Sequence, residues 1–403
     1  MQKIFLALLS LVLSSTYSTA QFWSPFKKCV IDANTGECIS NTILTALPFL
    51  RINPDARSGA LGDAGTALSP DPNAMHHNAA RLAFSENDMG IAATYSPWLR
   101  NLGIDDIYLF YLTGFKKIDN NQSVGGGIRY FSLGEIEFRD ENGMDLGTGK
   151  PNELELNLAY SRKLSEKFSA SLSAKFAYSN LASGRTVGTN QVTSAKSFGA
   201  DIGTFYRTSL GQSGRRNYLN LGLAITNIGS KVTYVKNLTK DFIPTNLSIG
   251  ANYEMNFDDY NSLNLIGEVN KFMVPSPIPP GDSTRYDLNK NGIADFREKA
   301  LFEGMLGSFG DAPGGFTEEL QEVMWTLALE YWYDKQFAVR MGYFNEHALK
   351  GNRKFLTLGC GVKYNVFGLN LSYLVPTNNN RSPLANTLRF TLLFDFANAE
   401  KEN

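Results

Sequence analysis

Apolar and polar side chains alternate with a period of two along most of this chain, in segments of about ten residues. In the segment 153–160, for example, one face is formed by Leu154, Leu156, Leu158 and Tyr160. Successive strand residues point to opposite faces of a sheet, so each segment predicts a strand that is apolar on one face only. A buried parallel strand would be apolar on both faces. The pattern therefore predicts an all-β protein built from antiparallel strands.

We expect about fourteen such strands, each close to the length of about 9–11 residues that a tilted transmembrane strand requires. The strands of a soluble β-sandwich are usually shorter, at about five or six residues. The predicted strands cover residues 88–98, 105–117, 122–133, 152–163, 166–180, 195–209, 217–228, 244–256, 260–272, 325–334, 336–345, 354–365, 367–376 and 385–396.

The connections between these strands alternate between short and long. Short ones lie around 118–121, 164–165, 210–216, 257–259, 335 and 366, and long ones around 134–151, 181–194, 229–243, 273–324, 346–353 and 377–384. Bacterial outer-membrane barrels have short turns on the periplasmic side and long loops outside, whereas a sandwich has no reason to alternate. The sequence thus predicts a transmembrane antiparallel β-barrel over residues 88–396, followed by a C-terminal tail at 397–403.

The strand face opposite to the apolar one carries charged side chains, which are costly toward lipid and acceptable in a polar interior. They are Glu155, Lys175, Glu268, Glu330, Arg340, Lys363, Arg389 and Asp395. Because both signs occur, we expect an ion-paired and partly filled lumen. Many tyrosines lie near the predicted strand ends, as in the aromatic belts of membrane proteins, although strands favour aromatic residues in any case.

Composition and the first residues narrow the class of protein. With 38 Lys+Arg against 39 Asp+Glu, the chain has no excess of basic residues of the kind that nucleic-acid binding requires.

Residues 1–20 combine Lys3, an apolar run at 4–13 and small residues before a cleavage site after Ala20, which is typical of a secretory signal peptide. No apolar run of about 20 residues follows it, so a membrane-spanning helix is not expected. The protein is therefore expected to be exported.

Three cysteines remain after the signal peptide, and export permits disulfides. Cys29 and Cys38 flank Asn34 and Gly36, residue types that favour a turn, so a small disulfide-linked hairpin is one interpretation. Two unpaired thiols in an N-terminal arm are the alternative. Cys360 lies inside a predicted strand and is expected to behave as a small apolar residue.

Residues 21–87 do not alternate, and the part at 48–84 is rich in Gly, Ala, Asp, Asn and Pro. We expect this part of the chain to enter the barrel from the periplasm and to plug the lumen or lie beneath it, with a free periplasmic arm as the alternative. The stretches 49–67 (FLRINPDARSGALGDAGTA) and 71–82 (DPNAMHHNAARL) resemble the N-terminal block of the PorV family, the outer-membrane barrels of the Bacteroidetes type IX secretion system. More distantly they resemble the plug of the FadL fatty-acid-channel family, whose Asn-Pro-Ala-Gly-Leu segment is replaced here at 78–82.

The resemblance implies a non-enzymatic protein of the cell outer membrane, surrounded by outer-membrane lipid. Members of this family bind the C-terminal signal domain of secreted cargo at the large translocon barrel and pass the cargo to the sortase-containing attachment complex. The alternative is a FadL-like channel for hydrophobic small molecules. The three histidines are His76 and His77 in the presumed plug and His347 in a long loop, and no serine is marked as a nucleophile activated by a neighbouring base. Packing or hydrogen bonding in the plug is the expected role of the first two, with metal binding by the pair as the alternative.

The long loop at 273–324 contains a twelve-residue EF-hand pattern at 287–298, which predicts a Ca²⁺ site. The expected ligands are Asp287, Asn289, Asn291, the backbone carbonyl of Ile293, Asp295 and Glu298. Gly292 permits the sharp turn, and residues 296–306 are expected to form the helix that follows, whereas the prolines at 275–280 forbid a helix before the loop. The alternative is a solvated turn whose acidic residues cap that helix.

Overall fold

The computed structural model describes residues 21–24, 29–32, 41–100, 103–139, 143–187, 190–211, 216–235, 238–278, 286–378 and 387–396. Its body is one closed antiparallel barrel of 14 strands, as predicted. Neighbouring barrel strands pair along the chain, and β20 pairs with β3 to close the cylinder. The barrel strands are β3 (Met89–Pro97), β4 (Ile107–Lys117), β5 (Gln122–Leu133), β8 (Asn152–Lys163), β9 (Phe168–Asn180), β12 (Ala195–Leu210), β13 (Asn217–Gly229), β14 (Asn246–Asn256), β15 (Asn261–Phe272), β16 (Met324–Tyr333), β17 (Phe337–Asn345), β18 (Lys354–Tyr364), β19 (Phe367–Pro376) and β20 (Leu388–Phe396).

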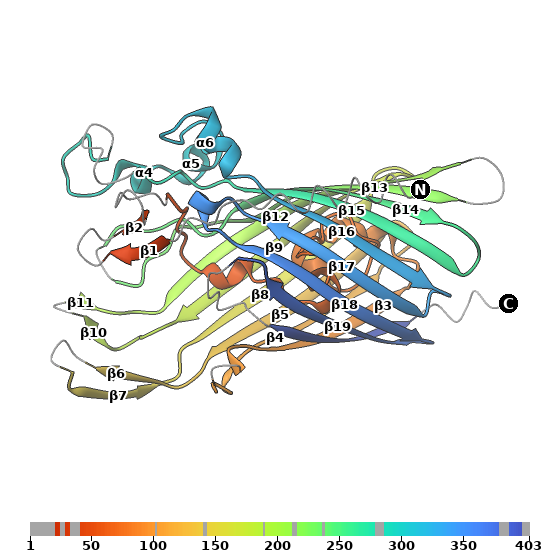
Figure 1. Ribbon diagram of the computed structural model, residues 1–403, viewed down its shortest axis with the longest axis horizontal. Helices are drawn as coiled ribbons and strands as arrows, with labels where there is room; N and C mark the ends of the chain where they lie inside the picture. The colour runs from red at the N-terminus through yellow and green to blue at the C-terminus, as the bar shows by residue number, and fades with distance from the viewer. Residues whose placement is uncertain are drawn as a thin grey trace.

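The two ends of the barrel differ. Among the described residues, the connections at one end are short turns, and the additional elements of the loops lie at the other end, at the left of Figure 1. We call the latter the outer end, because long loops face outward in bacterial barrels. Its elements are β6 (Ile136–Arg139), β7 (Asp145–Gly149), β10 (Thr186–Val187), β11 (Asn190–Gln191), α4 (Asp295–Glu298), α5 (Leu301–Gly307), α6 (Phe316–Gln321) and the 3-10 turn η4 (Ala348–Lys350). Two short strands before the barrel, β1 (Gln21–Ser24) and β2 (Cys29–Asp32), form a sheet of their own.

The alternation of the sequence matches the two faces of the wall. Leu158 and Leu172, for example, are 69% and 60% exposed on the outside, where lipid covers a barrel of this kind. Cys360 is also exposed on this face. Tyr111 differs from the aromatic-belt expectation: it points inward, is 3% exposed, and its ring lies 5.7 Å from the guanidinium of Arg129. The reason is its register, since Tyr111 lies on the inner face of β4 between Leu109 and Thr113.

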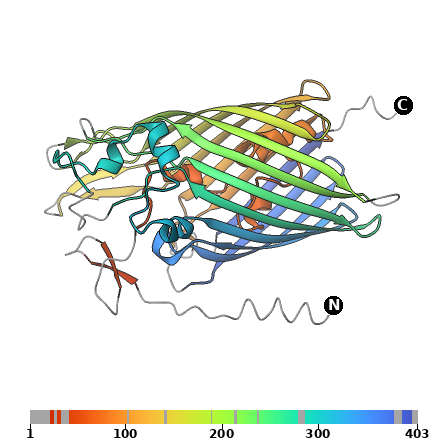
Figure 2. The same cartoon turned by 90° about the horizontal axis from the view of Figure 1, so that it is seen from above.

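The segment 48–84 lies inside the lumen in both views of the barrel (Figures 1 and 2). It consists of the short elements η1 (Pro48–Arg51), α2 (Ala56–Gly59), α3 (Ala74–His77) and η2 (Ala79–Phe84). We call residues 48–85 the plug.

The chain runs through the lumen from the outer end to the short-turn end, which differs from the expected entry from the periplasm. The backbone N–H of Ala46 donates to the carbonyl of Phe242 in the long β13–β14 loop, at 2.8 Å. Ser85 accepts from the Lys117 ammonium beside the short β4–β5 turn. Backbone hydrogen bonds to the outer loops therefore hold residues 41–47 at the outer end, not beneath the barrel.

No helix among the described residues is long and apolar enough to cross a membrane. The helix expected at 296–306 is split into α4 and α5, because Lys299 between them adopts an extended backbone conformation. Glu303 then caps the second helix by accepting from the N–H of Ala300 at 3.3 Å. The signal peptide at 1–20, Cys38 and the tail at 397–403 lie outside the described residues.

Candidate functional site

The plug is built from short capped turns that fit closely against the barrel wall. The Asp55 carboxylate caps α2 by accepting from the N–H of Ser58 at 2.8 Å, as an N-cap aspartate does. Gly62 has a positive φ of 64° and donates its N–H to the Thr357 hydroxyl on β18 at 2.9 Å. A Cβ on the neighbouring wall residue Gly342 would lie 2.2 Å from the nitrogen of Gly62. Glycine is thus required on both sides of this contact.

A buried ion network joins the plug to the wall. The Arg57 guanidinium donates twice to Glu330 on β16, with both distances 2.9 Å, and once to Asp71 at 2.8 Å. Arg340 on β17 donates to the same Glu330 carboxylate at 2.8 Å. Glu330 is fully buried, so its carboxylate has lost its contact with water. The two hydrogen bonds from Arg57 and the one from Arg340 offset the free-energy cost of that desolvation. The expectation of an ion-paired lumen therefore holds at this position.

A second network lies on the opposite wall, where Glu155 sits between two cations. Arg129 pairs with it at 2.9 Å and Lys175 at 3.5 Å, and Lys175 also pairs with Asp201 at 2.8 Å. The plug takes part through His76, whose Nδ1 lies 2.6 Å from Arg129. These contacts tie α3 to strands β5, β8, β9 and β12.

Three plug residues could suggest a hydrolase, namely Asp55, Ser58 and His77. Their arrangement differs from that of a catalytic triad. The Ser58 hydroxyl and the Asp55 carboxylate both contact the same ring nitrogen of His77, Nε2, at 2.9 and 3.2 Å. A catalytic triad needs the serine on one ring nitrogen and the orienting carboxylate on the other. Ser58 is also only 2% exposed. The cluster holds the plug together and does not form a nucleophile.

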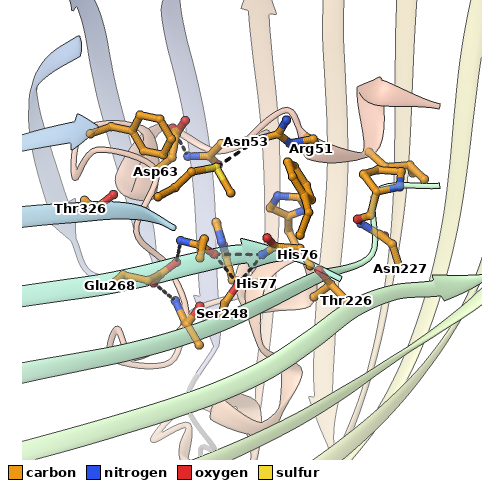
Figure 3. A pocket seen from close by; sticks show the side chains of 18 of the residues that line it. Arg51, Asn53, Asp63, His76, His77, Thr226, Asn227, Ser248, Glu268 and Thr326 are labelled. Carbon is orange, nitrogen blue, oxygen red and sulfur yellow. Dashed lines mark hydrogen bonds between the residues drawn. The ribbon is translucent and has the colours of Figure 1, made fainter. Parts of the chain in front are cut away.

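A small internal cavity of ≈ 100 Å³ remains between the plug and the β13–β16 wall. Figure 3 shows the side chains around it, including Arg51, Asp63, His77 and Glu268. Glu268 accepts from the backbone N–H groups of Gly65 and Thr66, at 2.9 and 2.8 Å, and so fastens the plug at this wall. Sites for organic ligands usually measure about 300–1,000 Å³, so this cavity has room for a few water molecules only.

A larger cavity of ≈ 800 Å³ lies at the outer end, above the plug. We call it the outer vestibule. Its walls include the apolar residues Ile43, Phe49, Trp98, Phe131, Phe355 and Leu374, and its charged residues are Arg51, Asp63, Glu153, Glu346, Lys350, Arg353, Lys354 and Arg389. Its volume falls in the range of ligand-binding pockets.

The long loop between β15 and β16 carries exposed apolar side chains on two short helices. On α5, Phe302 and Leu306 are spaced i, i+4 and are 66% and 71% exposed. On α6, Phe316 and Leu320 have the same spacing and are 77% and 57% exposed. Residues four apart share one face of a helix, so each helix presents an apolar pair to its surroundings. We call these four residues the outer apolar pairs.

Comparison with known proteins decides the family. The profile described as "Type IX secretion system protein PorV" matches residues 33–279, which is more than half of the chain. The chain belongs to the PorV family. It is a component of the type IX secretion system and a protein of the outer membrane. No curated protein matches the chain.

Solved structures with a similar shape include two toluene transporters and a FadL homologue. The toluene transporter TbuX of Ralstonia pickettii has 12% sequence identity and a TM-score of 0.46, over 86% of this chain and 99% of that one. The toluene transporter TodX of P. putida gives 12% and 0.46, over 85% and 99%. A Pseudomonas aeruginosa FadL homologue gives 11% and 0.42, over 89% and 100%.

The predicted calcium ligands of this PorV-family chain come together in the outer loop. Glu298 accepts from the side-chain amides of Asn289 and Asn291, at 2.7 and 2.8 Å. Asp287 accepts from the backbone N–H groups of Asn291 and Gly292, at 3.1 and 2.8 Å. One oxygen of Asp295 accepts from Leu288 N at 3.0 Å, and the other is enclosed without a hydrogen-bond partner.

Among the described residues, no three His, Cys, Asp or Glu side chains are grouped closely enough to hold a metal ion by themselves. A site in this loop therefore depends on the two asparagine oxygens and on the Ile293 carbonyl. Cys38, one of the two cysteines of the predicted disulfide, lies outside the described residues. His347 begins the η4 turn and accepts from the N–H of Leu349 at 3.3 Å.

Sequence reasoning found the inner charges but not their grouping at the outer vestibule. Arg51, Arg353 and Arg389 line its floor together with Asp63 and Glu346. Arg51 and Asp63 come from the plug, whereas the others come from β20 and the β17–β18 connection. The alternation marked Arg389 as inward-facing, but no signal in the sequence linked these five distant positions.

Proposed function

We propose that this PorV-family barrel is a cargo receptor and shuttle of type IX secretion. It binds the C-terminal signal domain of secreted proteins at the translocon and carries them to the sortase-containing attachment complex. Family membership supports the secretion role. The geometry supports a protein that binds other proteins at its outer surface and does not conduct small molecules through its lumen.

The observation that carries this proposal is the contrast between a filled lumen and an apolar outer surface. The internal cavity of ≈ 100 Å³ is too small for an organic ligand. The outer apolar pairs, in contrast, leave four large side chains more than half exposed. Exposed apolar groups of this kind usually mark protein–protein or membrane contact sites.

The experiment replaces one residue of each outer apolar pair, Leu306→Asp together with Phe316→Asp, in cells that lack the chromosomal gene. We expect the variant barrel to be present in the outer membrane while cargo with uncleaved C-terminal signals accumulates in the periplasm. Ile136→Asp is the matched control, because Ile136 is an exposed apolar residue of a different outer hairpin. Normal surface attachment of cargo in the double variant would contradict the proposed surface.

The alternative function is a FadL-like channel for hydrophobic small molecules. It requires a path through the lumen, but the plug leaves an internal cavity of only ≈ 100 Å³ beside the β13–β16 wall. Deletion of the gene separates the two functions, since loss of cargo attachment supports secretion. Impaired uptake of fatty acids with normal cargo attachment would support the channel.

We also propose that the loop 287–298 binds Ca²⁺. Two observations support this site. The twelve-residue pattern is complete, and the side chains of Asn289 and Asn291 are both hydrogen-bonded to Glu298. A half-turn of each asparagine amide presents its oxygen in place of its nitrogen. With three carboxylates, the site resembles the weak extracellular class, with a Kd of about 10⁻⁴–10⁻³ M.

Calorimetry on the full-length protein in mild detergent tests this site. Wild type is expected to release or absorb heat on titration with CaCl₂, and Asp287→Ala with Glu298→Ala is expected to abolish the signal. Asp105→Ala with Glu137→Ala is the control, because it removes the same charge from other outer segments. Identical titration curves for the site variant and wild type would rule out the proposed ligands.

A further inference from the structure

The short helix α6 turns its charged side chains inward and its apolar side chains outward, which is the reverse of an ordinary surface helix. Phe316 and Leu320 are 77% and 57% exposed. Glu319 and Glu322, the residue after the helix, are only 7% and 3% exposed. A surface helix of a globular protein normally buries its apolar face and exposes its charged one. The orientation of α6 must therefore be held by specific contacts on its buried side.

Two buried lysines hold this side of α6. Lys271 on β15 pairs with Glu319 at 3.0 Å and with Glu322 at 2.5 Å. Lys350 on η4 pairs with Glu322 at 2.9 Å and with Glu318 at 2.6 Å. The two lysines are 8% and 5% exposed. Each of the three carboxylates thus meets an ammonium group, and Glu322 meets both.

Hydrogen bonds complete the contacts on this side. The Ser276 hydroxyl donates to Glu322 at 2.6 Å, and the side-chain amide of Asn41 donates to Glu318 at 2.8 Å. The carboxylates of α6 are thus bound within the protein, as buried charges have to be. The face that α6 presents to its surroundings is uncharged and apolar.

α6 spans the rim of the barrel at the outer end. Lys271 follows Val269, which is 42% exposed on the outer surface, by two residues and so belongs to the outward row of β15. Lys350, in contrast, lines the outer vestibule. Neither Phe316 nor Leu320 is among the described residues that line the vestibule. Their apolar face is therefore open to a large partner at the cell surface and not to a small molecule inside the vestibule.

We propose that Lys271 and Lys350 are positioning residues that turn the apolar face of α6 toward the cargo signal domain. This inference rests on the proposed receptor function and names the contacts that shape its docking surface. Because the two lysines take up the carboxylates of the helix, the signal domain meets Phe316 and Leu320 and no charge of α6. The part of the signal domain that α6 recognises is thus an apolar patch.

The test removes both ammonium groups with Lys271→Met and Lys350→Met in one variant, which keeps the side chains long. Buried carboxylates without a cation are costly, so α6 is expected to turn its glutamates to water and to bury Phe316. Hydroxyl-radical footprinting with mass spectrometry measures the exposure of Phe316. Fluorescence anisotropy measures the binding of one cargo signal domain to the full-length barrel in lipid nanodiscs.

In wild type, we expect Phe316 to be oxidised in the free barrel and protected when the signal domain is bound. In the double variant, we expect less oxidation of Phe316 and an affinity lower by about 10-fold or more, because two apolar side chains leave the interface. Oxidation of Phe302 on α5 is expected to stay unchanged in the free double variant. A general loss of structure would change both phenylalanines and would contradict a positioning role.

Two further variants keep the test decisive. Glu322→Gln serves if the double variant does not fold, since it removes only the charge that both lysines share. It is expected to shift both readouts in the same direction by a smaller amount. Lys150→Met with Lys240→Met is the matched control, because these two lysines are exposed in other outer loops. The control is expected to bind as wild type does.

The outcomes separate this inference from the function on which it rests. Unchanged exposure of Phe316 in the double variant would overturn the positioning role. Reduced exposure with unchanged affinity would show that α6 does not dock the cargo, and would leave the receptor function standing. A wild-type barrel that binds no signal domain would count against the receptor function itself. Protection of Phe316 in nanodiscs before the signal domain is added would assign this face to the membrane and overturn the proposal.

Discussion

The lumen and the outer β6–β7 hairpin use charge in opposite ways. In the lumen, Glu330 is fully buried between two arginines that come from the plug and the wall. On the outer β6–β7 hairpin, both side chains of the Arg139–Glu137 pair are more than 60% exposed. A buried pair that loses one partner leaves an uncompensated charge, whereas an exposed pair exchanges its partner for water. The difference indicates that the barrel interior is built to stay closed and that recognition belongs to the outer end.

The largest effect is expected from breaking the network between plug and wall. Glu330→Ala leaves Arg340 without a carboxylate and Arg57 with Asp71 only. We expect a loss of about 3–5 kcal/mol in the free energy of unfolding. Denaturant unfolding in detergent, followed by tryptophan fluorescence, measures it. A loss below about 1 kcal/mol would show that the plug does not depend on this network.

A smaller effect is expected where the plug backbone touches the wall. Gly342→Ala places a methyl group 2.2 Å from the nitrogen of Gly62, and overpacking of this kind costs about 1–3 kcal/mol. Gly267→Ala is the matched control, because the nearest atom to its new methyl group is Leu327 Cδ2 at 3.8 Å. The same unfolding assay compares the two variants. Equal stability would mean that the plug can shift away from β17 at no cost.

The third prediction concerns pH at the rim of the vestibule. Burial by itself would raise the pKa of Glu346, but the adjacent Arg353 guanidinium outweighs it and holds the pKa below its ordinary value of 4.5. A depressed carboxyl pKa stabilises the folded state above the unfolded value, and the effect is lost as pH falls through the folded pKa. The stability difference between wild type and Glu346→Gln should thus be constant from pH 6 to 8 and vanish only below about pH 4.5. A difference that vanishes above pH 5.5 would contradict this.

The smallest effect is expected at the outer hairpin. Glu137→Ala removes the exposed ion pair with Arg139, which has a distance of 3.2 Å. Such pairs contribute about 0–1 kcal/mol and are screened by salt. We expect an unfolding curve within about 0.5 kcal/mol of wild type, which would confirm the contrast with Glu330. A loss comparable to that of Glu330→Ala would remove the distinction between the two regions.

The architecture followed from local pattern. The period-two alternation gave all fourteen strands, and the rhythm of short and long connections gave the gathering of the long connections at one end of the barrel. These features are local because a strand needs only its own residues to define an apolar and a polar face. The inward position of Glu155, Glu330, Arg340 and Arg389 followed from the same alternation.

The pairing of those charges required the folded chain. Arg57 and Glu330 are 273 residues apart, and they meet only because the plug passes β16 inside the closed cylinder. The contact between Gly62 and Gly342, the path of residues 41–47 along the outer end and the floor of the vestibule depend on the same packing. Periodicity states which face a side chain takes, but it carries no information on which distant side chain lies opposite. That is set when closure of the barrel brings the plug and the wall within hydrogen-bond distance.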